Sequence, residues 1–156
     1  MKKTVLITGA SRGIGRAIAV AFAKAGYNLV ITCSKSETEL LHLKNDLERD
    51  YSVDVLASIG DISDFEYVTQ LFSHIEQRFH GVDVLVNNAG NASVADREKG
   101  DIHANLCDMD DKTWDAIIER NLTLTYNVTA EVLKVMRKNR YGRIVFISSV
   151  TGPLVT

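Results

Sequence analysis

The sequence has few of the residues that build disulfide-linked, metal-bound or membrane-spanning proteins. Its 156 residues include two cysteines, Cys33 and Cys107, which form no CxxC pair and no metal-ligand cluster with the four scattered histidines. A disulfide framework is therefore not expected, and a reducing compartment fits. No apolar stretch approaches the length of a membrane span, and the run Val5–Ile7 is too short for the core of a signal peptide.

An excess of charge of either sign is also missing. The formal net charge is −2, so the sequence offers no electrostatic attraction for nucleic acid or for an anionic membrane. The hydrophobic share of 46% and the charged share of 24% are ordinary for a globular protein that buries a core. We therefore expect one soluble, cytoplasmic domain over residues 1–156, with neither nucleic acid nor membrane as a partner.

Proline is scarce as well. Pro153 is the single proline of the chain, although average usage is roughly 5%. A sequence that keeps all of its loops would be expected to hold more. The scarcity is a first indication that the chain is part of a longer protein.

Short apolar runs alternate with stretches in which apolar residues recur at helical spacing. The runs predict strands at residues 3–7, 28–32, 53–59, 82–86 and 143–147. Helical spacing predicts a first helix from Ile14 to a cap at Gly26, and one helix after each of the capping-box patterns Ser36–Glu39 and Ser63–Glu66. Residues 112–139 are also predicted to be helical, in one or two segments. The alternation implies βαβ crossovers, and therefore an α/β fold with a parallel sheet of about five strands and helices on both faces. Residues 91–110 are expected to form a long polar connection that is either functional or mobile.

A glycine-rich turn joins the first predicted strand to the first predicted helix. It reads Thr8-Gly9-Ala10-Ser11-Arg12-Gly13-Ile14-Gly15. Glycines allow a tight turn and let a pyrophosphate approach the backbone, and the helix that follows offers unpaired N–H groups to an anion. A plain strand-to-helix turn would also use glycines, but the place of this one after the first strand favours dinucleotide binding.

The turn has the pattern TGxxxGxG, and further motifs follow it in order. They are Asp61-Ile62 after the third strand, Asn87-Asn88-Ala89-Gly90 after the fourth, Asn121-Leu122 in the long helix, and Ser148-Ser149-Val150-Thr151-Gly152 after the fifth. With these motifs the sequence resembles the short-chain dehydrogenase/reductase family over its whole length. The resemblance implies a doubly wound Rossmann sheet, with the family's C-terminal strands lacking. It also implies cofactor contacts from Gly9, Ser11, Arg12, Gly13, Ile14, Gly15, Asp61, Ile62, Asn88, Ala89 and Gly90.

The end of the second strand indicates which nicotinamide cofactor is preferred. An acidic residue there would bond the ribose hydroxyls and repel a 2′-phosphate, but this sequence has Cys33-Ser34-Lys35. Lys35 and Arg12 both supply positive charge that can pair with a phosphate. Either cation alone could simply be a solvated surface residue. Together with the missing acid they predict NADP(H) rather than NAD(H), with cofactor contacts from Cys33, Ser34 and Lys35.

The resemblance implies hydride transfer between the nicotinamide and a small carbonyl or secondary alcohol. In the family a serine hydrogen-bonds the substrate oxygen, an asparagine helps to hold a proton relay, and a Tyr-x-x-x-Lys pair supplies the acid and base. Ser149 and Asn121 match the serine and the asparagine. None of the five tyrosines is followed by a lysine four positions later, so the acid–base pair is not in these 156 residues.

Two functions follow from this reading. The first is an NADP(H)-dependent reductase or dehydrogenase, most similar to the 3-oxoacyl-acyl-carrier-protein reductases, in which residues 1–156 are inactive by themselves. The alternative is a non-catalytic dinucleotide-binding fragment or remnant. A longer enzyme, an interrupted gene and a deliberate fragment all remain open as origins. Because the fifth strand would leave a sheet edge unpaired, self-association into a homo-oligomer is expected.

Overall fold

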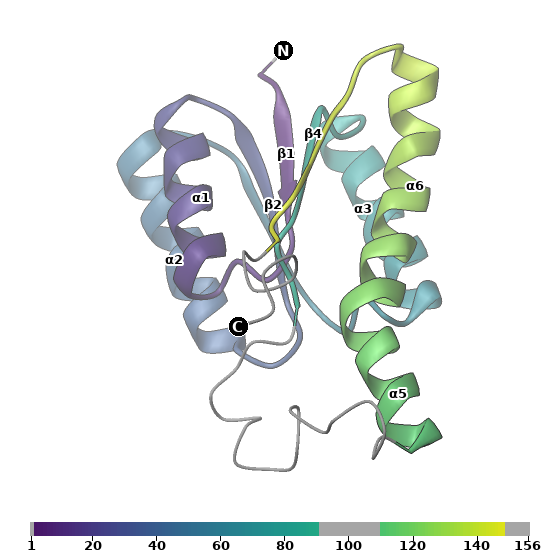
Figure 1. Ribbon diagram of the computed structural model, residues 1–156. Helices are drawn as coiled ribbons and strands as arrows, with labels where there is room; N and C mark the ends of the chain where they lie inside the picture. Colours follow the sequence, from purple (N-terminus) through teal and green to yellow (C-terminus); the bar gives the residue numbers. More distant parts are fainter. Residues whose placement is uncertain (1, 91–109, 149–156) are drawn as a thin grey trace.

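The computed structural model describes residues 2–90 and 110–148. These residues form one parallel sheet in the order β3-β2-β1-β4-β5, with helices on both faces (Figure 1). The strands are β1 (Thr4–Ile7), β2 (Asn28–Cys33), β3 (Val55–Ile59), β4 (Val84–Asn87) and β5 (Arg143–Phe146). The helices are α1 (Gly13–Lys24), α2 (Glu37–Tyr51), α3 (Phe65–Phe79), α5 (Asp111–Ile118) and α6 (Leu124–Asn139), with a π-helical turn, η2 (Glu119–Thr123), between the last two. The predicted α/β class and its five-stranded parallel sheet are confirmed.

The central strands are apolar on both faces because helices cover both. Val5 and Ile7 pack into a cluster with α1 and α2, whereas Leu6 between them packs with α3 and α6 on the other face. All three side chains are 0% exposed. Burial on both sides is why these strands appear in the sequence as unbroken apolar runs.

Some strand and helix ends differ from the predicted ones. The third and fourth strands begin at Val55 and Val84, later than the predicted residues 53 and 82. Val53 and Val82 are buried, as expected of strand residues, but they do not join the hydrogen-bond ladder. The second strand continues one residue further, to Cys33. Gly26 ends α1 as predicted, with φ +80° and its N–H donating to the Ala23 carbonyl at 2.9 Å.

Neither of the two predicted capping boxes forms with the predicted hydrogen bonds. Ser36 is the N-cap of α2, but its side chain makes no capping hydrogen bond. At α3 the cap is Asp64 rather than Ser63, and its carboxylate accepts from the N–H groups of Glu66 and Tyr67 at 2.8 and 3.4 Å. Ser63 is engaged elsewhere, because both its N–H and its hydroxyl donate to the Asp61 carboxylate.

The predicted helix over 112–139 is continuous but not uniform. The α-helical hydrogen-bond pattern of α5 gives way to the π turn η2 and then resumes in α6. A π turn adds one residue to a helical turn and is common at functional sites. The predicted connection 91–110 lies almost wholly outside the described residues. None of the described helices is long and apolar enough to cross a bilayer.

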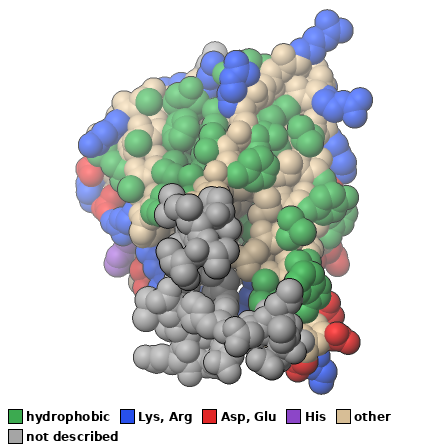
Figure 2. Space-filling model, viewed as in Figure 1, with side chains coloured by type: hydrophobic (Ala, Val, Ile, Leu, Met, Phe, Trp, Pro, Cys, Tyr) green, Lys and Arg blue, Asp and Glu red, His purple; other side chains and the backbone are tan. Residues whose placement is uncertain are grey.

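One face of the molecule carries exposed hydrophobic side chains. Figure 2 shows them over β5 and α6, and they include Val145, Phe146 and Ile147, which are 45%, 56% and 38% exposed. Within residues 2–90 and 110–148, β5 pairs with β4 and with no second strand. The predicted open edge at the fifth strand is therefore present among the described residues.

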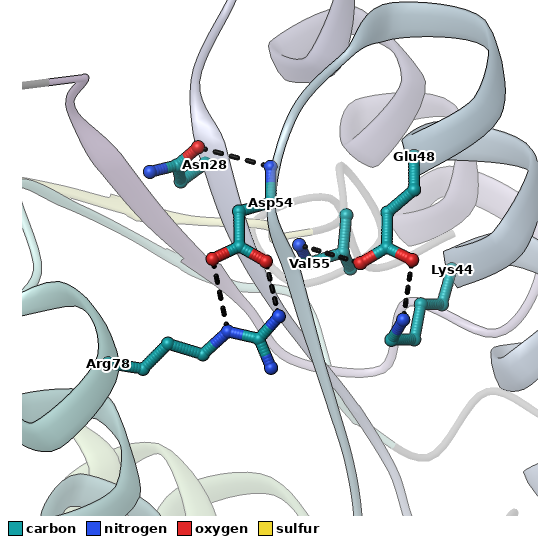
Figure 3. A network of polar contacts seen from close by, with 6 residues as sticks. All are labelled: Asn28, Lys44, Glu48, Asp54, Val55 and Arg78. Carbon is teal, nitrogen blue, oxygen red and sulfur yellow. Dashed lines mark hydrogen bonds and ion pairs between the residues drawn. The ribbon is translucent and has the colours of Figure 1, made fainter.

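A network of polar contacts holds the amino-terminal end of β3 (Figure 3). The Asp54 carboxylate pairs with the Arg78 guanidinium of α3, and the Asp54 N–H donates to the Asn28 side chain at 3.2 Å. Next to it, the Val55 N–H donates to Glu48 of α2 at 3.2 Å. The network joins both helix layers to the same strand.

The ion pair between Asp54 and Arg78 makes stability depend on pH. The hydrogen bond from Arg78 lowers the pKa of Asp54. The ion pair therefore contributes to stability above pH 4, and this contribution is lost as the pH falls through the lowered pKa. Both side chains are over 40% exposed, which limits the effect to about 1 kcal/mol. We expect Asp54→Asn to lower the free energy of unfolding by up to that amount at pH 7 and to have no effect at pH 2. Urea unfolding at both pH values tests this, with Asp115→Asn on the exposed surface of α5 as the control, because Asp115 forms no ion pair among the described residues. An equal loss at both pH values would contradict it.

Candidate functional site

The predicted site residues gather at the carboxyl edge of the sheet. β1 continues into the glycine-rich turn and β4 continues into Asn88, and these two strands are neighbours. The chain connects β1 to β2 on one side, whereas β4 lies on the other, so the strand order reverses between β1 and β4. Ligands of open α/β sheets bind outside the carboxyl ends at such a reversal.

A threonine side chain joins the two loops across this point. The Thr8 hydroxyl oxygen, 0% exposed, accepts hydrogen bonds from the N–H groups of Asn88 and Ala89, both at 3.0 Å. In return the Asn88 side-chain amide donates to the carbonyls of Thr8 and Gly9, at 3.0 and 3.1 Å. We call this set of four hydrogen bonds the Thr8–Asn88 clasp. It fixes the start of the glycine turn to the end of β4.

Two glycines allow this close fit. Gly9 has φ +66°, and a β-carbon there would lie 3.0 Å from the Cα of Ala89. A β-carbon on Gly15 would collide with the Gly9 carbonyl oxygen and lie 2.5 Å from the Asn88 amide nitrogen. Gly15 therefore lets the first turn of α1 rest directly on the clasp, which is a packing role.

The first turn of α1 faces outward and is open. Arg12 is its N-cap, in an extended conformation, and no side chain within residues 2–90 and 110–148 caps the helix. No heavy atom of the described part of the chain lies within 4 Å of where a β-carbon on Gly13 would be, and Ile14 is 61% exposed. Ser11, by contrast, is 7% exposed. An uncapped helix start with free space around it suits an anion.

The end of β2 lies beside the turn. The Ala10 N–H donates to the Thr32 carbonyl at 2.9 Å, which holds the turn next to Cys33. The Cys33 thiol is 6% exposed and belongs to the core, and burial raises its pKa. The predicted cofactor contact from Cys33 stays a prediction, and the burial of its side chain leaves little of the thiol accessible to a ligand. Ser34 and Lys35 are exposed.

The predicted adenine-side residues follow β3. The Gly60 N–H donates to the Cys33 carbonyl at 2.9 Å, so this segment is fixed to the end of β2. Asp61 is exposed, and its Oδ1 accepts from the N–H and the hydroxyl of Ser63 at 2.9 and 2.8 Å. Ile62 is 6% exposed and packs between the sheet and the helices α3 and α6. Any cofactor contact from Ile62 would therefore come from its backbone.

Asn121 lies in the π turn. Its side-chain amide donates to the Ile117 carbonyl at 2.9 Å, and its own carbonyl accepts from the Thr125 hydroxyl at 3.2 Å. A β-carbon on Gly90 would lie 3.6 Å from the Asn121 Oδ1, so the end of the Asn87–Gly90 motif and the π turn are adjacent. The predicted catalytic Ser149 lies outside the described residues.

Two buried or half-buried polar residues near the site were not predicted. Asn127 of α6 is 5% exposed and donates to the carbonyls of Ile62 and Ser63. Tyr67 of α3 covers Gly60, shares a 2.6 Å hydrogen bond with the Ser58 hydroxyl, and has its pKa raised by burial. A polar residue within the apolar face of a helix, as at Asn127, is a signal that the sequence does contain.

The strand order and the helices on both faces define a Rossmann-like α/β sheet. The sequence matches the family model described as short chain dehydrogenase over residues 3–155. The chain therefore belongs to the short-chain dehydrogenase family.

Individual relatives agree with this membership. The chain is 37% identical to the 3-oxoacyl-acyl-carrier-protein reductase FabG of Aquifex aeolicus over 96% of its own length and 56% of that protein. Among solved structures, the L-sorbose reductase of Gluconobacter frateurii with NADPH and L-sorbose is 28% identical, with a TM-score of 0.84 over 99% of this chain and 56% of that one. An alcohol dehydrogenase of Thermococcus sibiricus with 5-hydroxy-NADP is 30% identical, with a TM-score of 0.83 over 99% and 62%. The chain thus spans a little over half the length of these relatives.

The clasp predicts a specific cost for losing the Thr8 hydroxyl. Thr8→Val keeps the shape of the side chain but leaves the N–H groups of Asn88 and Ala89 without their acceptor, and each unpaired donor costs about 1 kcal/mol or more. We expect the free energy of unfolding to fall by about 2 kcal/mol, measured by urea denaturation. Thr8→Ser, which keeps the hydroxyl, should lose clearly less. A stability of Thr8→Val equal to that of the unmodified protein would show that the clasp contributes nothing, because this variant keeps the methyl group and loses only the hydroxyl.

Proposed function

We propose that this chain is the cofactor-binding part of an NADP(H)-dependent oxidoreductase of the short-chain dehydrogenase type. The observation that carries the proposal is the open, uncapped start of α1 next to Arg12, held in place by the Thr8–Asn88 clasp. Family membership gives the class of reaction, and the details below are proposals for this chain.

The residues at the carboxyl edge suit a dinucleotide. The N–H groups at the start of α1 would bind the pyrophosphate, because no side chain of the described residues caps them and the helix end carries partial positive charge. Gly13 leaves the space in front of them open, and Gly9 and Gly15 keep side chains out of the turn. Asp61 would accept from the adenine, and the backbone of Ala89 and Gly90 would lie along the other half of the cofactor.

The charge at the end of β2 favours a 2′-phosphate. Arg12 and Lys35 are both exposed, and neither forms an ion pair among the described residues. An acidic residue at position 33 would repel the phosphate, but this position holds Cys33, whose side chain is buried and neutral. The structural relatives named above were solved with NADPH and with an NADP derivative, which supports the same preference.

The chemistry requires support for an oxygen that gains charge. A bound NADPH supplies the hydride. Ser149 would hydrogen-bond the substrate oxygen, and Asn121, held by its bond to the Ile117 carbonyl, would steady the proton relay. The chain contains no Tyr-x-x-x-Lys sequence, so the acid–base pair of the proposed enzyme would belong to a further part of a protein as long as the relatives.

The substrate is proposed more coarsely than the cofactor. A small carbonyl compound or secondary alcohol fits the family, and the similarity to a 3-oxoacyl-acyl-carrier-protein reductase favours a 3-oxoacyl group. The alternative is a unit that binds the dinucleotide without catalysis, which the missing Tyr-x-x-x-Lys sequence favours. NADPH consumption by the purified full-length gene product with a 3-oxoacyl thioester separates the two.

The cofactor preference has a direct test in Arg12 and Lys35. Charge-assisted hydrogen bonds are worth about 1.5–3 kcal/mol, so Arg12→Ala should weaken binding of NADPH by about tenfold or more and leave NADH unchanged. Lys35→Ala should add to this loss. Titration calorimetry of the full-length gene product measures both cofactors, with Lys24→Ala at the far end of α1 as the control. Equal affinity of the unmodified protein for NADH and NADPH would overturn the preference.

The serine assignment is tested against its neighbour. Ser149→Ala should lower kcat by about 100-fold, as loss of a hydrogen-bond donor to a developing oxyanion does, with NADPH affinity unchanged. Ser148→Ala should have little effect on either. The measurement is steady-state NADPH oxidation by the full-length gene product together with equilibrium binding. A large loss in Ser148→Ala alone would move the role to Ser148.

A further inference from the structure

Asn127 is a polar residue in the apolar face of α6. Leu124 and Val128 beside it, and Val132 one turn further, are buried against the sheet and α3. Asn127 is itself 5% exposed. A buried amide costs free energy unless it is hydrogen-bonded, so its partners indicate what it is for.

Its partners are the two residues that follow Asp61. The Asn127 Nδ2 donates to the Ser63 carbonyl at 2.7 Å and to the Ile62 carbonyl at 3.3 Å, across 64 and 65 residues of sequence. Both carbonyls precede α3, so the hydrogen-bond ladder of that helix does not use them. Without Asn127 they would lose their donor in a buried setting.

The segment that carries Asp61 is thereby held from two sides. On one side the Gly60 N–H bonds to the Cys33 carbonyl of β2, and on the other Asn127 bonds to the residues after Asp61. The carboxylate of Asp61 is in turn oriented by Ser63, which donates to it twice. A shift of the Ser63 backbone would therefore move the Asp61 carboxylate.

We infer that Asn127 is a positioning residue that sets affinity for the adenosine end of the cofactor, by fixing residues 61–63 from α6. The inference rests on the proposed function, since it assumes that Asp61 faces the adenine. Asn127 does not touch the cofactor. Its helix follows directly on the π turn that carries Asn121, so one helical unit sets the positions of Asn121 and of the adenosine-side segment.

Thr129 provides a matched control on the same helix. Its hydroxyl oxygen accepts from the Asn87 side-chain amide at 3.0 Å, which ties α6 to β4 without involving residues 60–63. The Asn87 Oδ1 is buried and has no hydrogen-bond partner among the described residues. Removing the Asn127 amide breaks two hydrogen bonds between α6 and residues 62–63, whereas removing the Thr129 hydroxyl breaks one between α6 and β4.

The experiment compares Asn127→Leu with Thr129→Val in the full-length gene product. Both variants should be destabilised in urea. Only Asn127→Leu should lose affinity for NADPH and for 2′,5′-ADP, by about tenfold and by the same factor for both, because both ligands carry the adenine that Asp61 is proposed to contact. With a turnover assay, KM for NADPH should rise and kcat at saturation should stay within about twofold. Asn127→Ser, a smaller change in packing, serves if Asn127→Leu does not fold.

The outcomes separate the inference from the function beneath it. If the unmodified protein binds 2′,5′-ADP and the Asn127 variants bind it equally well, Asn127 is structural only and the inference is wrong. An equal loss of affinity in Thr129→Val would also overturn it, since general loosening of α6 would then be the cause. If the unmodified protein binds neither NADPH nor 2′,5′-ADP, the proposed function fails and the inference fails with it.

Discussion

The Thr8–Asn88 clasp is the constraint on which the site depends. β1 and β4 are adjacent strands whose ladder ends at Ile7 and Val86, with one further backbone hydrogen bond from the Thr8 N–H to the Val86 carbonyl at 3.1 Å. Beyond that point the two chains leave the sheet toward different elements. The clasp links them there with side chains, through Thr8 as acceptor and Asn88 as donor. Because Gly15 rests on the same atoms, the start of α1 is positioned by the clasp as well.

The same construction recurs along the whole carboxyl edge. The Gly60 N–H bonds to Cys33, the Ala10 N–H bonds to Thr32, and Asn127 bonds to the segment after Asp61. Each link uses a group that points into the protein. The groups that face outward include the first turn of α1, Arg12, Lys35 and Asp61. Internal hydrogen bonds thus fix the frame, and the outward groups are left for recognition of a ligand.

The strands and most of the motif residues of the candidate site could be predicted from the sequence, whereas the direction of several side chains could not. The strands were visible because Val5, Leu6 and Ile7 are buried on both faces, which leaves an apolar run. The cap of α3 was misplaced because Ser63 and Asp64 both suit an N-cap, and only the structure shows Ser63 bonded to Asp61. Motifs identified Asn88, Cys33 and Ile62 but not their direction, and all three side chains turn inward. The π turn adds a single residue to a turn, too small a change of period to detect.

The helix unit of α5, η2 and α6 connects the two ends of the proposed cofactor site. Its π turn brings Asn121 close to Gly90 at the end of β4, on one side of β1. Six residues later Asn127 reaches the segment after β3, which lies on the other side of β1. A helix is stiff over this distance, so the relative position of Asn121 and Asp61 is set by helical geometry and not by the intervening loops. Changing the register of the π turn would therefore alter the site at both ends at once.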